Sequence, residues 1–497
     1  MLLRFIIIVV VFFVGQIVVL TQESNVTARK PCRIEVREQG TNILVPLVEL
    51  RTTHQQRFVT DNAGVIALDS PELIGRETWF NVNGYGYSVK QDGFGMSGVR
   101  LIPEYGKTLR VDVQRDIVAK RLGRLTGAGC FAESQKLGEY TQIPETGVFG
   151  CDSVQNAVYN GRLFWIWGDT TLAHYPLGIF HATAATTDIA PFSAQVVLKS
   201  LKLDTQTQQQ EAVVQRRNLS LKLEPPLFLA YQYFTDATEK PRGVAVMSGD
   251  KPTWLSGCVV LPDKKGTQRL VAVYAKIHPP LEVYEYGLCV WNDAKKSFEH
   301  LRTIWAKKQD SRSTKPIVPE GHAVLWRDKQ GKCWVLFGDP FPRLRCPATY
   351  EAWQNPDQWE TLTPQNQLLS ASDNSPIIPH SGSIAWNTFR QCWVTVFTQK
   401  FGKPTAFGEV WYAESDEPTG HWGNAVKILS HGNYTFYNPC IHAESFSQDS
   451  QILLFEGTFA AMFADNPPLV PRYDYTQILY RLDLNDSALA AAQKNKK

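Results

Sequence analysis

Carboxylate side chains recur at matching places in five similar segments of the sequence. Each segment has a polar start, a short apolar stretch, a turn rich in Gly, Lys, Asp or Asn, and a second, strongly apolar stretch. The segments span residues 151–169, 256–276, 320–339, 381–399 and 438–457. Their first apolar stretches begin at Asp152, Ser256, Glu320, Ser381 and Asn438, and their second stretches end at Asp169, Lys276, Asp339, Gln399 and Glu456. These acids suffice for acid and base chemistry if the fold gathers them.

Crowded carboxylates repel one another and resist joint ionisation, so a cluster of them is costly unless a ligand, a cation or catalysis uses it. Two carboxyl groups on opposite sides of a channel can serve as general acid and general base in the cleavage of a glycosidic bond. A structural explanation competes for Asp169 and Asp339, because an Asp often closes a β turn by bonding its own backbone. Asp152 and Glu320 begin strands, so that explanation fits them less well.

The repeated segments also predict the fold. Each forms a strand pair that cannot bury both faces alone, so neighbouring units must pack on one another. We therefore predict an all-β protein with a five-bladed β-propeller of four-stranded blades over residues 147–484. A right-handed β-helix is the competing fold, but its repeats are shorter and more regular. The second strand of a blade runs antiparallel to the first, so we expect the acids at both positions to meet at one mouth of the channel.

The preceding part of the chain has a different pattern. Residues 31–114 contain seven short β-like stretches separated by turns such as DNAG, NGYG and QDGFG, which is typical of a small β-sandwich. Residues 115–146 read as a linker in which RDIVAKRLGRL (115–125) forms a short helix, and residues 485–497 read as a polar tail. The sequence therefore predicts two folded domains joined by a linker.

The first 22 residues and the overall charge restrict location and partners. An apolar run from Phe5 to Leu20 follows Arg4, which indicates an export signal or, at this length, a retained membrane anchor. We expect a secreted, periplasmic or cell-surface protein that touches a membrane only if this segment is retained. The net charge is +3 with no long basic run, which excludes the electrostatic footprint of a nucleic-acid-binding protein. The nine Cys show no spacing typical of a zinc site.

Several short motifs resemble known families. The hairpin FVTDNAGVIAL (58–68) resembles the transthyretin-like carboxypeptidase regulatory domains that are attached to secreted enzymes. The motifs GCDSV (150–154), PEGHAVLW (319–326) and GEVWYAESDEPTGHW (408–422) resemble the five-bladed propeller glycosidases of the arabinanase and β-xylosidase-like superfamily.

The second resemblance implies catalytic roles. It implies that Asp152 is the general base and that Glu320 is the general acid. It also implies a third carboxylate, an Asp that raises the pKa of the acid, at the start of the second blade, where this chain has Ser256. Asp339 or Asp169 is then the candidate for that role.

Other side chains are candidates for binding substrate. His322, His380 and Asn438 lie near the starts of first strands, and Asp169 and Glu456 lie at the ends of second strands. Trp254 could stack on a sugar ring, and Arg345 could meet an acidic or sulfated sugar. No catalytic metal or cofactor is expected, although the channel histidines could help hold a structural Ca²⁺ through water.

The leading hypothesis is an exported glycoside hydrolase that acts on an oligo- or polysaccharide. A glycan-binding or surface-assembly propeller without catalysis is the alternative that Ser256 favours. A polysaccharide lyase is a third hypothesis, in which His322 or His380 acts as base beside Arg345. No residue identifies the sugar, the linkage, the anomeric outcome or the oligomeric state.

Overall fold

The computed structural model describes residues 29–126, 133–143, 146–189, 229, 231–245, 247–249, 251–307, 315–442, 451–465 and 467–492. This part of the chain is nearly all β, which confirms the prediction of an all-β protein. Its helical turns are α1 (Glu133–Lys136), α4 (Tyr350–Trp353), η1 (Pro356–Gln358) and η2 (Ser487–Leu489). The segment 1–22, predicted as an export signal or anchor, lies outside the described residues. Within them, no helix has the length and apolar character needed to span a membrane.

The N-terminal part consists of two four-stranded sheets over one shared core. The first sheet contains, in spatial order, β4 (Val65–Leu68), β1 (Cys32–Glu38), β8 (Thr108–Arg115) and β6 (Tyr87–Ser88). The second contains β3 (Arg57–Val59), β2 (Glu49–Thr52), β5 (Thr78–Asn83) and β7 (Gly98–Leu101). Alternate residues of β1, among them Ile34 and Val36, are buried and pack in the core that includes Phe80 of β5. The period of two along β1 therefore fixes which face it buries.

Five four-stranded antiparallel sheets follow, which we call sheets I to V. Sheet I contains β11 (Gln155–Tyr159), β12 (Arg162–Trp167), β15 (Thr183–Thr187) and β16 (Gln232–Tyr233). Sheet II contains β17 (Thr253–Pro262), β18 (Gln268–His278), β19 (Glu282–Asn292) and β20 (Ser297–Ala306). Sheet III contains β21 (His322–Arg327), β22 (Cys333–Gly338), β23 (Pro342–Pro347) and β24 (Glu360–Thr361).

Sheets IV and V complete the series. Sheet IV contains β27 (Pro379–Asn387), β28 (Cys392–Gln399), β29 (Glu409–Ser415) and β30 (Val426–Ser430). Sheet V contains β31 (Thr435–Ile441), β32 (Ile452–Ala460), β33 (Thr476–Asp483) and β9 (Lys120–Arg124). Two small sheets accompany them, one of β10 (Val148–Cys151), β13 (Thr170–Leu172) and β14 (Tyr175–Ile179), the other of β25 (Leu368–Leu369) and β26 (Pro376–Ile377).

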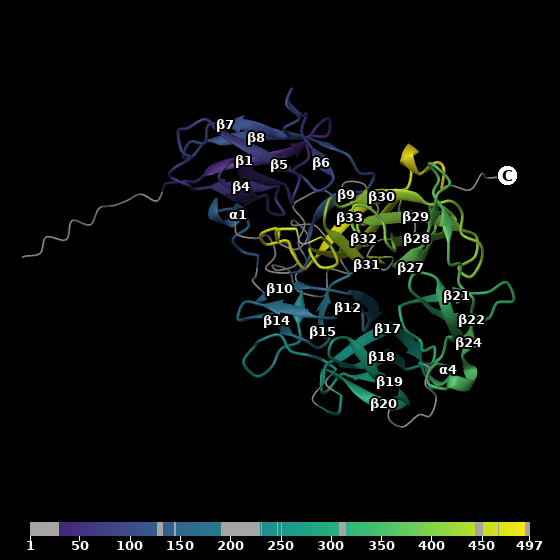
Figure 1. Ribbon diagram of the computed structural model, residues 1–497. Coiled ribbons are helices and arrows are strands. Elements are labelled where there is room, and N and C mark those ends of the chain that lie inside the picture. Colours follow the sequence, from purple (N-terminus) through teal and green to yellow (C-terminus); the bar gives the residue numbers. More distant parts are fainter. Residues whose placement is uncertain are drawn as a thin grey trace, which may run out of the picture.

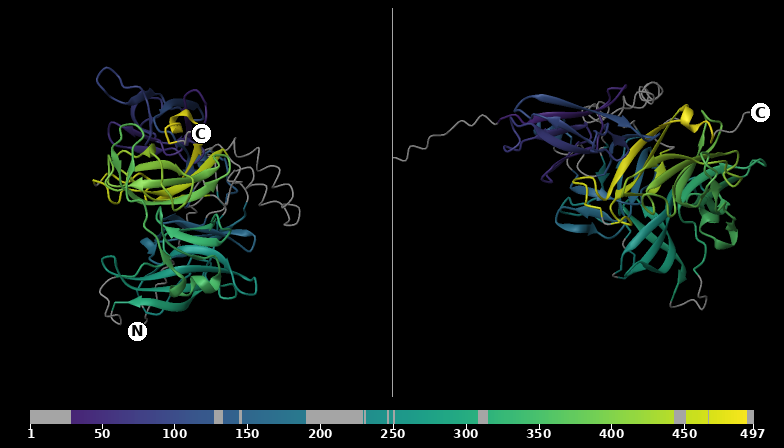
Figure 2. Two further views of the ribbon diagram at one scale, coloured as in Figure 1. Left: turned by 90° about the vertical axis from the view of Figure 1, so that its right-hand side faces the viewer. Right: turned by 45° about the horizontal axis from the view of Figure 1, so that its top comes forward.

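The first strands of sheets I to V lie next to one another in chain order. Strand β11 contacts β17, β17 contacts β21, β21 contacts β27, and β27 contacts β31. The series returns to its start where the side-chain amide of Asn156 in β11 lies 2.9 Å from Nδ1 of His442, directly after β31. In Figure 1 the labels β17, β21, β27 and β31 surround a common centre, and the two turned views in Figure 2 show the N-terminal sheets beside this assembly.

Sheet V is assembled from two distant parts of the sequence. Its outermost strand, β9, pairs antiparallel with β33, with Arg124 opposite Ile478. Residues 351 positions apart also join directly, because the backbone N–H of Gln477 donates to Oγ1 of Thr126 at 3.2 Å. The helix that we predicted for residues 115–125 is therefore wrong at β9. Pairing with β33 overrides the local preference of this segment, an effect that no local pattern reveals.

Strand β9 also attaches the N-terminal sheets. The guanidinium group of Arg121 is buried and lies 4.9 Å from the centre of the Tyr87 ring. It donates hydrogen bonds to four backbone carbonyl groups of the N-terminal part, at Pro46, Leu47, Gly84 and Tyr85. Buried carbonyl groups that lose a donor cost free energy, so this side chain holds the two parts together.

We expect Arg121→Met to lower the free energy of unfolding by about 3 kcal/mol or more, because it leaves several buried carbonyl groups without a donor. Urea denaturation followed by circular dichroism measures the change. Arg110→Met is the matched control, since Arg110 lies half-exposed beside Asp112 and its ion pair contributes little. Equal denaturation midpoints for the two variants would contradict the role assigned to Arg121.

Candidate active site

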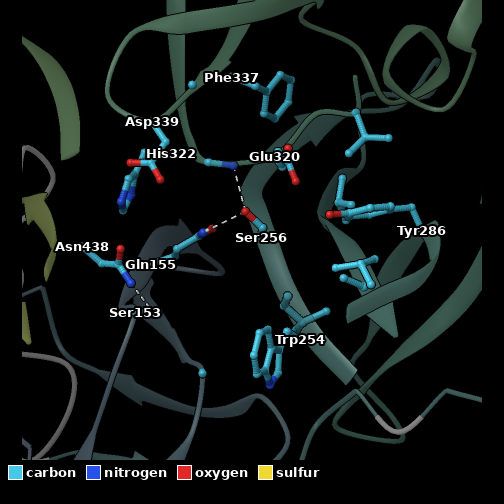
Figure 3. Close-up of a pocket in the computed structure, with 18 of the residues that line it drawn as sticks. Ser153, Gln155, Trp254, Ser256, Tyr286, Glu320, His322, Phe337, Asp339 and Asn438 are labelled. Carbon is cyan, nitrogen blue, oxygen red and sulfur yellow. Dashed lines mark hydrogen bonds between the residues drawn. The ribbon is translucent and has the colours of Figure 1, made fainter. Parts of the chain in front are cut away.

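A cavity of about 590 Å³ opens where the first strands of sheets I, II and III meet. Figure 3 shows it with Glu320, His322 and Asp339 on one side and Ser153, Gln155 and Trp254 below. Eight of the ten residues predicted for the site line this cavity: Asp152, Asp169, Trp254, Glu320, His322, Asp339, His380 and Asn438. The fold thus gathers side chains that are scattered along the sequence.

The other two predicted residues, Arg345 and Glu456, are not among the described residues that line the cavity. Arg345 forms an ion pair with Glu360 at 2.6 Å, and its guanidinium group lies 4.1 Å from the centre of the Trp334 ring. Glu456 is fully buried, with Oε1 2.9 Å from Nε2 of His442. We therefore correct the positions expected for both side chains.

An irregular backbone position recurs in the first strands, or just before them, at the end that faces the cavity. The angle φ is 53° at Ser153, 63° at Gly257, 90° at Gly321 and 53° at Asn438, all in the left-handed region. Gly382 occupies the matching place in sheet IV, where an added Cβ would lie 2.2 Å from the carbonyl oxygen of Val396. The pairing register also shifts at this level in sheets II, IV and V.

This recurring position corrects the alignment of the five units. The residues directly before it are Asp152, Ser256, Glu320, Ser381 and Tyr437. Tyr437, rather than Asn438, is therefore the equivalent of Asp152 in sheet V. The bulge in β31 also places Glu456 opposite Cys440 and deeper in the sheet. Apolar periodicity shows where a strand runs, but it does not show an inserted residue.

The serines at these equivalent positions bind the neighbouring sheet. Oγ of Ser256 accepts a hydrogen bond from the backbone N–H of Gly321 at 2.8 Å, and Oγ of Ser381 accepts one from Asn438 at 3.1 Å. Between sheets III and IV this task falls to Asp339, whose Oδ1 accepts from the backbone N–H of Gly382 at 2.6 Å. The side-chain hydroxyl of Ser256 therefore joins sheet II to sheet III by accepting a hydrogen bond from a backbone N–H.

Glu320 differs from Ser256 and Ser381 because Asp339 makes the backbone contact to sheet IV. The carboxylate of Glu320 faces the cavity, and both of its oxygens lie 3.4 Å from Nζ of Lys315. The Glu320 side chain is 36% exposed. Lys315 also lies 4.3 Å from the centre of the Tyr286 ring. The carboxyl group of Glu320 is thus accessible to a ligand in the cavity.

Asp152 is held by hydrogen bonds from its neighbours. Its Oδ1 accepts from the backbone N–H of Asp169 at 2.9 Å, and its Oδ2 accepts from the hydroxyl of Tyr437 at 3.2 Å. A Cβ on Gly168 would lie 2.3 Å from Oδ1, so the glycine permits this close approach. Burial raises the pKa of Asp152 to about 6, although hydrogen bonds from Tyr475, Asp169 and Tyr437 oppose the rise. Asp152 is therefore oriented, and it titrates near neutral pH.

Asp169 and Asp339 each lie beside one of the other two acids. Burial, followed by the charge of Asp152, raises the pKa of Asp169 to about 8. Burial also raises the pKa of Asp339 to about 7, with a further contribution from the charge of Glu320. Oδ1 of Asp169 is buried without a hydrogen-bond partner among the described residues. The cavity therefore contains two acid pairs, and Asp152, Asp169 and Asp339 can exchange protons with a ligand near pH 7.

Histidines lie near the centre of the five sheets. Burial, with a smaller effect from His442, lowers the pKa of His322 to about 4, so His322 is neutral at pH 7 and can donate or accept a hydrogen bond. Across the described ranges, no three His, Cys, Asp or Glu side chains are grouped to share one metal ion. The structural Ca²⁺ that we expect to be held through water stays a prediction.

The sequence interpretation missed four residues around the acids: Lys315, Tyr286, Tyr437 and Tyr475. Lys315 and Tyr286 line the cavity, and Tyr437 and Tyr475 bond Asp152. A shift of one residue in the alignment of the fifth unit would have revealed Tyr437. Tyr475 and Lys315 lie outside the repeated segments, so the repeat gave no signal for them.

A scan against protein-family models and a search of curated proteins find no match for this chain. Solved structures with a similar shape include an exo-1,5-α-L-arabinanase from a bovine ruminal metagenomic library, with 10% identity, a TM-score of 0.36, and coverage of 67% of this chain and 93% of that one. An exo-β-1,3-galactanase from Phanerochaete chrysosporium has 9% identity, a TM-score of 0.36, and coverage of 68% and 61%. A GH43_1 enzyme from Xanthomonas citri, complexed with xylotriose, has 8% identity, a TM-score of 0.36, and coverage of 68% and 87%. Similarity at this level identifies no functional residue in this chain.

The raised pKa of Asp169 predicts a pH-dependent stability. Between the ordinary carboxyl pKa of about 4 and pH 8 the folded state binds more protons than the unfolded state, so the free energy of unfolding falls as the pH rises, by up to about 1.4 kcal/mol per pH unit for one group. We expect Asp169→Asn to reduce this fall. Urea denaturation at pH 5 and pH 8 measures it, with the exposed Asp357→Asn as control. Parallel losses of stability in both variants would contradict the burial of a titrating Asp169.

Proposed function

We propose that this chain is a glycoside hydrolase in which Asp152 is the general base and Glu320 is the general acid. One observation carries the proposal: at five equivalent strand positions, Ser256 and Ser381 bind neighbouring backbone, whereas Asp152 and Glu320 line one cavity from different sheets. Two separately placed carboxyl groups around a space for substrate and water are the minimal requirement of glycoside hydrolysis.

We further propose that sheets I to V are the blades of a five-bladed β-propeller and that the two N-terminal sheets form a β-sandwich like those of carboxypeptidase regulatory domains. The contacts between consecutive first strands and the return contact from His442 to Asn156 support the propeller. The shared core of the N-terminal sheets supports the sandwich. Export through residues 1–22 and an oligo- or polysaccharide substrate belong to the same proposal.

The proposed reaction needs one proton transfer from Glu320 and one to Asp152. Glu320 gives its proton to the glycosidic oxygen as the bond from that oxygen to the anomeric carbon breaks. Asp152 takes a proton from the water whose oxygen forms the new bond to that carbon. Carboxyl groups on different sheets suit the wider separation of inverting enzymes. Because Lys315 pairs with Glu320, substrate must displace this contact before Glu320 can act as an acid.

Asp339 is the proposed replacement for the third carboxylate that the family resemblance implies. Its charge interacts with that of Glu320, and its hydrogen bond to Gly382 fixes its position. Two neighbouring carboxyl groups resist joint ionisation, so Asp339 affects the charge that surrounds Glu320. Asp339 is therefore a positioning residue for the acid.

A glycan-binding protein without catalysis is the second candidate, and the Lys315 contact favours it, because an ion-paired Glu320 is not ready to donate a proton. The lyase hypothesis is weaker, since the ion pair with Glu360 occupies the Arg345 that was to neutralise a substrate charge.

We expect Asp152→Asn and Glu320→Gln each to lower turnover by about 100- to 10,000-fold, which is the usual contribution of a positioned acid or base. Release of reducing ends from arabino-, xylo- and galacto-oligosaccharides measures turnover. Glu360→Gln, which changes an exposed acid paired with Arg345, is the control and should keep activity. Full activity in either cavity variant would overturn the roles proposed for Asp152 and Glu320, and binding without cleavage by the wild type would favour the second candidate.

For Asp339→Asn we expect the pH–rate profile to shift near pH 7, because the variant lacks the buried carboxyl group beside Glu320 whose pKa is about 7. The profile of kcat/KM between pH 4 and pH 9 on the best oligosaccharide measures the shift. A variant that loses activity equally at every pH would show that Asp339 serves the fold rather than the acid.

A further inference from the structure

A series of aromatic rings leads away from the cavity toward sheets IV and V. The ring of His380, which lines the cavity, lies 4.2 Å from that of Phe407 between their centres. Phe407 lies 5.7 Å from Phe463, and Phe463 lies 5.7 Å from Tyr437, whose hydroxyl bonds Asp152. Phe463 is thus connected to the acidic cavity along two routes.

Phe463 is the solvent-exposed end of this series of rings. Its side chain is 54% exposed, and that of the preceding Met462 is 46% exposed. The planes of Phe407 and Tyr437 make angles of 81° and 85° with the Phe463 ring, so neither stacks flat on it. The Phe463 ring is therefore accessible while its position is defined by two neighbours.

The backbone at Phe463 is unfavourable for an aromatic residue. Its φ is 60°, in the left-handed region that glycine adopts without steric cost. Phe401, which is 72% exposed in the loop that leads to Phe407, has a φ of 58°. Local strain of this kind persists where the surrounding structure holds it, and it gathers at binding sites. Neither burial nor turn chemistry accounts for a phenylalanine at position 463.

The support beneath Phe463 is rigid. Tyr437, Ala460 and Tyr475 form a buried cluster against which Phe407 packs. The loop is also fixed by the backbone N–H of Ala461, which donates to Oδ1 of Asp474 at 2.7 Å. A preorganised aromatic ring loses little conformational entropy when a ligand binds, which makes it an effective contact.

We propose that Phe463 is a platform for a second sugar ring of an oligosaccharide whose scissile bond lies between Asp152 and Glu320. This inference rests on the proposed function. A pyranose or furanose ring has an apolar C–H face that suits an aromatic ring, and continuity with the cavity through His380 and Phe407 favours a sugar over an unrelated partner. The preferred ligand is therefore a chain of sugars rather than a single unit.

The test compares ligands of increasing length. Calorimetry measures the binding of arabinose, xylose and galactose, and of their oligosaccharides of up to four units, to the full chain carrying Asp152→Asn, which slows turnover. In this background we expect Phe463→Ala and Phe463→Gly to weaken the binding of the oligosaccharides about three- to tenfold and to leave monosaccharide binding within about twofold. Phe463→Tyr should retain the oligosaccharide affinity.

Two controls separate binding from folding. Phe94→Ala removes a phenylalanine that is 94% exposed on the N-terminal sheets and should change no affinity. Phe463→Gly should keep or raise the thermal midpoint, because glycine suits a φ of 60°.

Each further outcome decides between the proposals. Unchanged oligosaccharide affinity in Phe463→Ala overturns the platform and leaves the proposed function intact. A lower midpoint in Phe463→Gly together with weaker monosaccharide binding makes Phe463 a packing residue and also overturns the platform. If the parent binds no sugar and the wild type cleaves none, the proposed function fails and the platform fails with it.

Discussion

The pairing of β9 with β33 is the contact on which the remaining structure depends. It supplies the fourth strand of sheet V, and sheet V in turn carries Tyr437, which orients Asp152. The same strand attaches the N-terminal sheets through Arg121 and through the side chain of Asn62, whose amide exchanges two hydrogen bonds with the backbone of Arg124 at 2.8 and 2.9 Å. The N-terminal domain is therefore attached to sheet V, the sheet whose Tyr437 orients Asp152.

The cavity buries carboxyl groups at a cost in free energy, and the polar side chains around it have different roles. Five equivalent backbone irregularities bring polar side chains to one level, and hydroxyl groups at two of them satisfy the neighbouring sheet. Asp339 takes over that task in sheet III and leaves Glu320 facing the cavity. Burial raises the pKa values of Asp152, Asp169 and Asp339 to about 6, 8 and 7, so these carboxyl groups exchange protons near neutral pH. The hydrogen bonds between sheets thereby determine which carboxyl groups remain available to a ligand.

The sequence predicted the features that depend on local patterns. Alternating apolar residues located most of the strands, and the repeat alone placed Asp152, Glu320 and Asp339 at one mouth. Prediction failed where distant residues decide the outcome. Strand β9 exists because of β33, and the bulge before Cys440 put Tyr437 at the position expected for Asn438 and moved Glu456 from its expected place. The position predicted for Arg345 was wrong for a similar reason, since its partner Glu360 comes from a separate strand.

The closure of sheet V also sets an order of events during synthesis. Residues 351 positions apart must meet, and at ribosomal rates of about 5–20 residues per second that stretch takes roughly 20–70 s to make. During this time β9 has no partner, and a strand edge without a partner invites pairing with other chains. Sheets II, III and IV contain their own strands and can form meanwhile. Completion of the cavity therefore waits for the arrival of β33, the last strand among the described residues.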